Sequence, residues 1–193
     1  MSHVATQSAV VSSDAELLVL VDSNDRVLGT RSKALCHDGA GVLHRAFSLF
    51  VFNRAGELLI QQRHASKRLW PLYWSNSCCS HPRAGEEIDE AVGRRLEQEL
   101  GLTVALSYLY KFEYTAPFGA VGTEHELCSV YAGVATAEPV VNTTEIADWR
   151  WIAPPALERE LATSPQRFTP WFKLEWNALC HEYRAPLDRI LHP

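Results

Sequence analysis

The sequence predicts a single α/β domain of the α+β kind, in which helices pack on the faces of a mixed β-sheet. Its 193 residues are enough to bury a substantial core within one domain. Hydrophobic residues make up 47% of the chain and charged residues 21%, as in ordinary globular proteins. The expected elements run in the order strands, helix, strands, helices, with no internal repeat and no linker, which is typical of such a fold.

The first third of the chain is expected to form short strands joined by tight turns. Apolar runs flank the polar turn at residues 22–25, and further apolar runs flank the Arg-Ala-Gly turn at residues 54–56. Turn residues between strand-forming runs are typical of β-hairpins. Residues 33–43 are expected to be irregular. The expected strands are residues 16–21, 26–30, 44–53 and 57–63.

Residues 86–100 form the clearest expected helix. Its apolar residues recur at every fourth position and therefore lie on one face. Acidic residues in its first turn suit the helix dipole, and Gly101 is a typical C-terminal stop. The apolar residues are Ile88, Val92, Leu96 and Leu100.

The second half of the chain is expected to add strands to the sheet and then helices that cover it. The expected strands are residues 109–115, 124–134 and 148–152, and the expected helices are residues 154–163 and 168–183. The domain is therefore expected to span residues 15–185, between a disordered lead at residues 1–14 and a C-terminal tail at residues 186–193.

Charge and cysteine content argue against several classes of protein. A formal net charge of −5 argues against nucleic-acid binding. Five cysteines, an odd number without a repeating framework, indicate reduced thiols in a cytoplasmic protein rather than a disulfide scaffold. The first residues lack the basic start of a signal peptide, and no apolar run is long enough to span a bilayer. We therefore expect a soluble cytoplasmic protein without a membrane or nucleic-acid partner.

Residues 74–82 form the most unusual stretch of the chain, Trp-Ser-Asn-Ser-Cys-Cys-Ser-His-Pro. It brings two thiols, an imidazole and an amide into one short segment. Alternate side chains of an extended segment share a face, so Cys79 and His81 are expected on one side and Cys78 and Ser80 on the other. Taken alone, the stretch fits a buried cysteine-rich turn as well as it fits a functional loop.

Three histidines and two glutamates are candidates for a metal site. His37, His44 and His81 can meet at one end of the sheet, and Glu124 and Glu126 share a face of an expected strand. Neighbouring carboxylates repel each other unless a cation or a shared proton lies between them. Three imidazoles and two carboxylates suit a divalent ion such as Mn²⁺, Mg²⁺ or Zn²⁺. Structural histidines and a solvated acidic strand face are the alternative interpretation.

Four basic residues from separate segments could together bind a diphosphate, since guanidinium groups bind phosphate in a bidentate manner. Each of them is, individually, also typical of an ordinary surface charge. They are Lys33, Arg63, Lys67 and Arg95.

The segment from Ser80 to Leu102 resembles the Nudix box, a loop–helix–loop that holds divalent metal against a diphosphate. Its matching charged positions are Glu86, Arg94 and Glu99. The pattern has a glycine and two glutamates where this chain has Ser80, Arg95 and Gln98. The carboxylate cluster of a Nudix pyrophosphohydrolase is therefore thinned.

Residues 76–82 resemble the Asn-Ser-x-Cys-x-His-Pro signature of the type I isopentenyl-diphosphate isomerases, a family with a Nudix fold. The resemblance extends over residues 17–176, and a thinned Nudix box is itself typical of that family. Only Cys78 and Ser80 depart from the usual signature, at positions without an assigned role. The other matches are His37, His44, Trp70, Pro71, Trp74, Tyr114, Glu124, Glu126, Cys128, Pro170 and Trp171.

The resemblance implies an enzyme of isoprenoid biosynthesis, the route to carotenoids among other products, that interconverts isopentenyl diphosphate and dimethylallyl diphosphate. The reaction adds one proton to an alkene and removes another, through a tertiary carbocation that water must not reach. By the resemblance, the catalytic residues are Cys79, Glu126, Tyr114 and Trp171. Tyr114 would relay the proton of Glu126, and the Trp171 ring would stabilise the cation by roughly 2 kcal/mol.

The resemblance also implies two metal sites and a diphosphate site. The first divalent ion would be held by His37, His44, His81, Glu124 and Glu126. Glu99 and the backbone carbonyl of Cys79 would hold a Mg²⁺ that arrives with the substrate. The diphosphate would be bound by Lys33, Arg63, Lys67 and Arg95. A monomer or weak homodimer is expected.

Two other functions remain as alternatives. A Nudix hydrolase of a nucleoside or other diphosphate would release phosphate, although its full carboxylate cluster is missing here. A non-catalytic ligand-binding Nudix module would not need Cys79.

Overall fold

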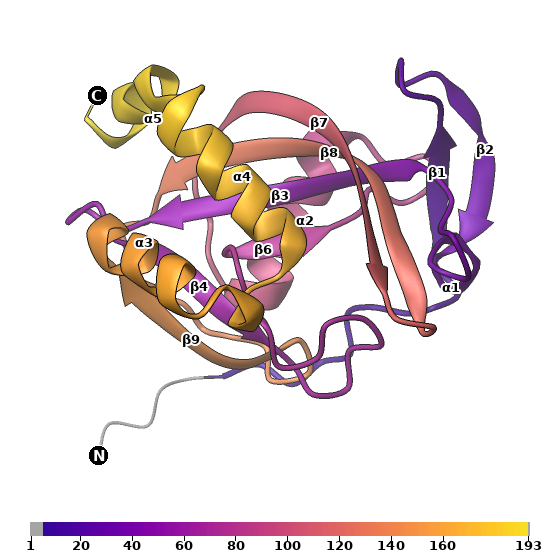
Figure 1. The fold of residues 1–193 in the computed structure, drawn as a ribbon, viewed down its shortest axis with the longest axis horizontal. Helices are drawn as coiled ribbons and strands as arrows, with labels where there is room; N and C mark the ends of the chain where they lie inside the picture. Colours follow the sequence, from indigo (N-terminus) through magenta and orange to yellow (C-terminus); the bar gives the residue numbers. More distant parts are fainter. Residues whose placement is uncertain (1–5, 193) are drawn as a thin grey trace.

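Strand β3 (His44–Phe52) is the centre of the sheet in the computed structural model, which describes residues 6–192 (Figure 1). It pairs in parallel with β8 (Gly122–Val134) and antiparallel with β6 (Cys78–Ser80), so the sheet is mixed as predicted. The other strands are β1 (Leu17–Val21), β2 (Val27–Ser32), β4 (Leu58–Arg63), β5 (Trp74–Ser75), β7 (Leu106–Phe118) and β9 (Ile146–Ile152). The helices are α1 (Lys33–Cys36), α2 (Ile88–Leu100), α3 (Pro154–Thr163), α4 (Pro170–His181) and α5 (Arg184–Leu191), and a short 3₁₀ turn (Pro165–Arg167) separates α3 from α4.

The two faces of β3 contribute to two separate hydrophobic cores. Alternate residues of a strand point to opposite faces, and a strand covered on both faces becomes almost continuously apolar. The core under α2 receives Phe47, Leu49 and Val51. The core under α3, α4 and α5 receives Ala46, Phe50 and Phe52. The helices therefore cover both faces, with α3 and α4 in front of the sheet and α2 behind it in Figure 1.

Helix α2 keeps its predicted apolar stripe but begins two residues later than expected. Leu96 and Leu100 are at most 1% exposed, and burying a leucine side chain stabilises a fold by about 1.5–3 kcal/mol. Glu86 lies before the helix because its carboxylate accepts two hydrogen bonds from Arg94, at 2.5 and 2.7 Å. Gly101 ends the helix with a φ of 61°, the left-handed conformation that favours glycine.

Several other boundaries differ from the predicted ones. Strand β7 begins before residue 109 and runs to Phe118, because it pairs with β8 as far as the turn at Gly119. Helix α4 is shorter than residues 168–183, since proline fits the first turn of a helix and Pro170 begins it. Residues 33–36, expected to be irregular, form the one-turn helix α1.

Both ends of the described chain belong to the folded domain. Gln7 pairs in parallel with Asn142, whose side chain donates a hydrogen bond of 2.8 Å to the carbonyl of Ala9. The prediction of a disordered lead is therefore wrong for residues 6–14, and residues 1–5 lie outside the described part. The expected C-terminal tail begins inside α5, where Leu187 is only 3% exposed because it packs into the core under α4. Among residues 6–192, no helix has both the length and the apolar character needed to cross a membrane.

Candidate active site

A cavity of about 330 Å³ opens at the end of the sheet where β3 begins. Its walls come from segments far apart in the sequence, including α1, β6, α2, β8 and α4. Twelve of the thirteen predicted site residues line it. The thirteenth, His44, is fully buried at the first position of β3, directly beside Glu126 in the parallel register of β3 and β8. The structure therefore brings the predicted residues to one place.

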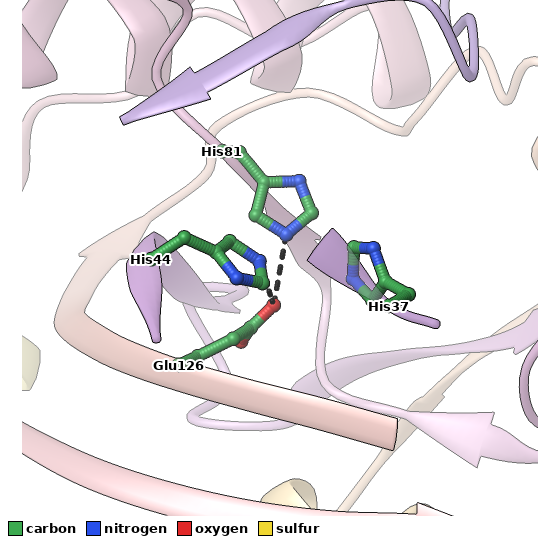
Figure 2. Close-up of side chains that lie close together, drawn as sticks. All are labelled: His37, His44, His81 and Glu126. Carbon is green, nitrogen blue, oxygen red and sulfur yellow. Dashed lines mark hydrogen bonds and ion pairs between the residues drawn. The ribbon is translucent and has the colours of Figure 1, made fainter. Parts of the chain in front are cut away.

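Three imidazoles and one carboxylate converge beside this cavity, as Figure 2 shows. One ligand atom from each of the four residues lies within 4.8 Å of the others. His81 Nε2 lies 2.8 Å from Glu126 Oε1, and His44 Nε2 lies 3.7 Å from the same oxygen. The four residues are His37, His44, His81 and Glu126. The fifth predicted ligand, Glu124, is outside this group but contacts His37 Nε2 at 2.8 Å.

Hydrogen bonds orient two of the imidazoles for binding a metal. Nδ1 of His37 donates to the carbonyl of Lys33, and Nδ1 of His44 donates to the carbonyl of Val42, each at 2.7 Å. The Nε2 lone pairs therefore face the group, as they do in metal-ligating histidines. Nε2 of His44 is buried and has no hydrogen-bond partner within the described residues. Such an atom, with two more imidazoles and a carboxylate beside it, fits a divalent ion.

The same residues influence one another's charge. Burial disfavours charge on His37, but the Glu124 carboxylate outweighs burial and raises the pKa of His37 to about 9. The His37 charge in turn lowers the pKa of Glu124 to about 2, against the effect of burial. Burial and the charge of His37 lower the pKa of His44 to about 4. Burial, with the charges of His44 and His37, also lowers the pKa of His81. A metal would therefore displace a proton from His37, because both bind the same Nε2 lone pair.

Glu126 and Tyr114 form a hydrogen-bonded pair on one wall of the cavity. The Tyr114 hydroxyl donates to Glu126 Oε2 at 2.6 Å from the neighbouring position on β7. Burial and the nearby charge of Glu124 raise the pKa of Glu126 to about 8. A carboxyl group with a pKa near neutrality can both give and take a proton, which suits general acid–base chemistry.

Cys79 lies on β6 and reaches the cavity, whereas Cys78 faces the core under α2 as its alternation predicts. The Cys79 thiol donates to Asn76 Oδ1 at 2.8 Å, and its sulfur accepts from Trp171 Nε1–H at 3.2 Å. Burial raises the pKa of this thiol above its ordinary value. The sulfur therefore carries a proton and is held by neighbours on two sides. Ser80 also reaches the cavity, although alternation places it on the other face.

Trp171 is 2% exposed and presents its ring to the cavity. The guanidinium carbon of Arg63 lies 5.3 Å from the centre of this ring. Aromatic faces attract cations, and this distance is within the range of such an interaction.

All four predicted basic residues line the cavity, but each already has protein partners. Lys67 and Arg95 both form ion pairs with Glu145, and Arg95 also pairs with Glu99, the predicted Mg²⁺ ligand. Lys33 donates to Ser12 Oγ at 2.6 Å, and burial and the charge of Lys67 lower its pKa.

Arg63, the fourth of these residues, donates to the carbonyls of Leu69 and Trp70 at 3.0 and 3.1 Å. The four basic side chains are therefore held in place before any anion binds.

Comparison with known proteins is consistent with this geometry. Residues 42–172 match the NUDIX domain family. The chain is 45% identical over 163 residues to isopentenyl-diphosphate Delta-isomerase 1 of Photorhabdus laumondii, a match that covers 83% of this chain and 93% of that protein. It is 40% identical over 157 residues to the isopentenyl-diphosphate Delta-isomerase of Serratia proteamaculans, covering 81% of this chain and 87% of that protein. The chain belongs to the isopentenyl-diphosphate Delta-isomerase family of Nudix proteins.

Solved structures confirm the predicted Nudix fold of this family member. A Deinococcus radiodurans protein superimposes with a TM-score of 0.64 at 26% identity, covering 77% of this chain and 90% of that one. The MutT protein of Methanosarcina mazei Go1 superimposes with a TM-score of 0.60 at 17% identity, covering 73% of this chain and 95% of that one. The second likeness concerns the fold alone.

Sequence reasoning missed three polar residues of this isomerase-family site. Ser48 is the only polar residue in the apolar run of residues 46–52, and that isolation was the available signal. Glu175 stands four residues after Trp171 and therefore shares its helix face, where the other residues are apolar. Glu145 has no distinguishing pattern in the sequence, yet it pairs with two of the basic residues.

Proposed function

We propose that this chain interconverts isopentenyl diphosphate and dimethylallyl diphosphate in isoprenoid biosynthesis, the reaction that the names of its relatives indicate. The observation that carries the proposal is one cavity lined by a protonated thiol, a carboxyl group with a pKa near neutrality, and four basic residues. The basic residues suit the diphosphate, and the thiol and carboxyl group suit the alkene.

The chemistry follows from the two proton-carrying groups. One of them, Cys79 or Glu126, gives a proton to the terminal alkene carbon, and the electrons of the double bond form the new C–H bond. The positive charge then lies on the tertiary carbon. The other group removes a proton from the next carbon, and the electrons of that C–H bond form the new double bond. In the reverse direction the two groups exchange roles.

The surroundings of the two groups suit a cationic intermediate. Trp171 presents an aromatic face that cannot react as water would, and a desolvated cation gains roughly 2 kcal/mol from such a face. Trp70 packs edge-on against the Trp171 ring, with 5.2 Å between the ring centres, so a second aromatic side chain supports this ring. Aromatic side chains around the reacting carbons help to keep water from the carbocation.

Bound divalent ions belong to this proposal. His37, His44, His81, Glu124 and Glu126 would hold one ion, which could be Mn²⁺, Mg²⁺ or Zn²⁺. Glu99 and the backbone carbonyl of Cys79 would hold a Mg²⁺ that arrives with the diphosphate. Such ions supply positive charge that shifts the acidity of neighbouring groups and neutralises phosphate oxygens. Lys33, Arg63, Lys67 and Arg95 would bind the diphosphate.

Incubation of the protein with isopentenyl diphosphate and Mg²⁺ tests the function directly. We expect dimethylallyl diphosphate without release of free phosphate, because the proposed reaction breaks no phosphate ester. Product analysis by chromatography, together with a phosphate assay, gives the answer. Free phosphate would instead support a Nudix hydrolase, and an unchanged substrate would support a non-catalytic binding module.

Removal of divalent ions is expected to abolish turnover. Protein purified without added ions should retain a tightly bound divalent ion, because three imidazoles and a buried carboxylate converge on one point. Elemental analysis would identify it. After chelation, Mg²⁺ alone should restore part of the activity, since it also accompanies the diphosphate. Full activity in ion-free protein would contradict both metal sites.

We also propose that the enzyme works in the cytoplasm on a small isoprenoid diphosphate, without a nucleic-acid or membrane partner. The five cysteines, each of which is free, support this location. We expect a monomer or a weak homodimer, which sedimentation over a range of concentrations would distinguish.

A further inference from the structure

Glu175 is a buried carboxyl group behind Cys79 that the mechanism above does not use. We propose that Glu175 is an uncharged carboxylic acid that orients, through Cys128 and Ser48, the hydrogen bonds made to the sulfur of Cys79. Glu175 is therefore a positioning residue for the proposed isomerase reaction. Its effect on turnover rests on that proposed function, whereas its charge state and its hydrogen bonds do not.

The surroundings of Glu175 disfavour a negative charge. The residue is 1% exposed, and its Oε2 atom has no hydrogen-bond partner within the described residues. None of the lysines, arginines or histidines at positions 6–192 forms an ion pair with it. The titratable groups around its carboxyl group are the thiols of Cys128 and Cys79 and the carboxyl group of Glu126, while the Tyr110 hydroxyl donates to its backbone carbonyl. A buried carboxyl group without a cationic partner takes up a proton.

The pKa of Glu175 is shifted in the direction that these surroundings predict. Burial raises the pKa of Glu175 to about 8, although hydrogen bonds from Ser48 and Cys128 act in the opposite direction. The carboxyl group of Glu175 is therefore protonated at neutral pH.

A chain of buried polar groups connects Glu175 with Cys79. Cys128 Sγ lies 3.6 Å from Glu175 Oε1 and 3.5 Å from Ser48 Oγ, and Ser48 Oγ lies 3.5 Å from Cys79 Sγ. Ser48 and Cys128 are each 1% exposed, so water does not compete for these contacts. The chain crosses from α4 through β8 and β3 to β6.

The proton on Glu175 determines which group donates and which accepts in each hydrogen bond between Glu175 and Cys79. Cys128 has a single S–H group, which an ionised Glu175 would attract, because a carboxylate only accepts hydrogen bonds. A protonated Glu175 instead donates to the Cys128 sulfur, so that the Cys128 S–H is free to donate to Ser48. The Ser48 hydroxyl then donates to the sulfur of Cys79. That hydrogen bond stabilises the Cys79 sulfur whenever the thiol has given its proton to the substrate.

The charge state of Glu175 can be tested with the variant Glu175→Gln, which keeps the shape and removes the titration. An ordinary glutamate has a pKa of 4.5, and that of folded Glu175 is about 8. The unfolded wild-type chain therefore releases a proton that the folded chain keeps, and wild-type stability falls as pH rises from about 4.5 to 8. We expect the melting temperature of Glu175→Gln to rise progressively relative to wild type across this interval. A difference that does not depend on pH would overturn the proposal.

The positioning role can be tested with Glu175→Met, which is similar in length but cannot donate a hydrogen bond. We expect kcat for isopentenyl diphosphate to fall by about two- to tenfold, the effect of one lost hydrogen bond, with KM unchanged. The alkylation rate of Cys79 at fixed pH, located by peptide mapping, should fall by a similar factor. Ser48→Ala should produce the same losses, and the double variant should lose no more than either single variant.

Four results separate the possible explanations. Equal losses in Glu182→Met, a matched change at the exposed residue that caps the C-terminal end of α4, would indicate a general effect on α4 and overturn the positioning role. Additive losses in the double variant would overturn the path through Ser48. If wild type shows no turnover, the isomerase proposal fails alone, because the melting and alkylation measurements still decide the inference. If Glu175→Met does not fold, Glu175→Gln, whose amide can still donate, should keep turnover within about threefold of wild type.

Discussion

Replacement of Cys79 by alanine is expected to abolish interconversion of the two diphosphates while the fold persists. The thiol is one of the two groups that the proposed reaction needs for its protons, and alanine carries none. Loss of a positioned acid or base typically costs about 10²–10⁴-fold in rate. Burial keeps the Cys79 thiol protonated, and contacts with Asn76 and Trp171 fix the position of the sulfur.

The measurement is kcat with saturating isopentenyl diphosphate and divalent ion, beside a thermal unfolding curve. Cys78→Ala is the matched control, because Cys78 is the adjacent thiol but lies in the core under α2. We expect the control to keep its turnover. Alkylation should inactivate wild type and Cys78→Ala alike. A Cys79→Ala enzyme with near-normal turnover would refute the assignment of this acid–base group.

The residue pattern predicted the site better than it predicted the neighbours that support it. His37, His44 and His81 could be grouped because all three match the family resemblance, although the chain has eight histidines. The reason that they meet lies in strand register: His44 is beside Glu126 on β8, and Phe47 is opposite Ser80, so that His81 follows nearby. A one-residue shift in either register would move these side chains to the other face. Periodicity alone does not determine such a register.

The existence of the helices and hairpins could be predicted from residues close together in the sequence, but their exact ends could not. The stripe of α2 and the stop at Gly101 depend on residues within the helix, so the sequence predicts them well. The start of α2 depends on the ion pair between Glu86 and Arg94, a contact across the bend that precedes the helix. The lead at residues 6–14 similarly has the composition of an unstructured segment, yet Gln7 hydrogen-bonds Val141 and Thr143, and Ala9 accepts a hydrogen bond from Asn142, far along the chain. Partners that are distant in sequence leave no local pattern.

The charged residues at the site gave the least local signal. Glu145 and Glu175 have opposite surroundings in the structure, although both are simply glutamates in the sequence. Glu145 is paired with Lys67 and Arg95, and these charges lower its pKa against the effect of burial. Glu175 has no such cation among the described residues, and burial raises its pKa to about 8. The protonation state of each glutamate is therefore a property of the folded chain.

Replacement of Glu126 by glutamine is expected to abolish turnover as completely as the loss of Cys79. Glutamine keeps the shape but cannot give or take a proton at neutral pH, whereas burial and the charge of Glu124 raise the pKa of Glu126 to about 8. We expect a loss of at least about 10³-fold, within the range for general acid–base catalysis. Tyr114→Phe should lose less, because it removes the hydroxyl that donates at 2.6 Å and leaves the carboxyl group in place.

Glu126 is also one of the four residues that converge with the histidines, so the test must separate proton transfer from metal binding. Turnover should be measured over increasing concentrations of divalent ion until it no longer changes, with the bound ion quantified in the same samples. Glu113→Gln provides the matched control, since Glu113 lies on β7 outside the cavity and pairs with His125. If saturating metal restored turnover in Glu126→Gln, Glu126 would act only as a ligand. Persistent inactivity with the ion bound is the outcome expected if its carboxyl group carries the proton, because metal alone does not replace that group.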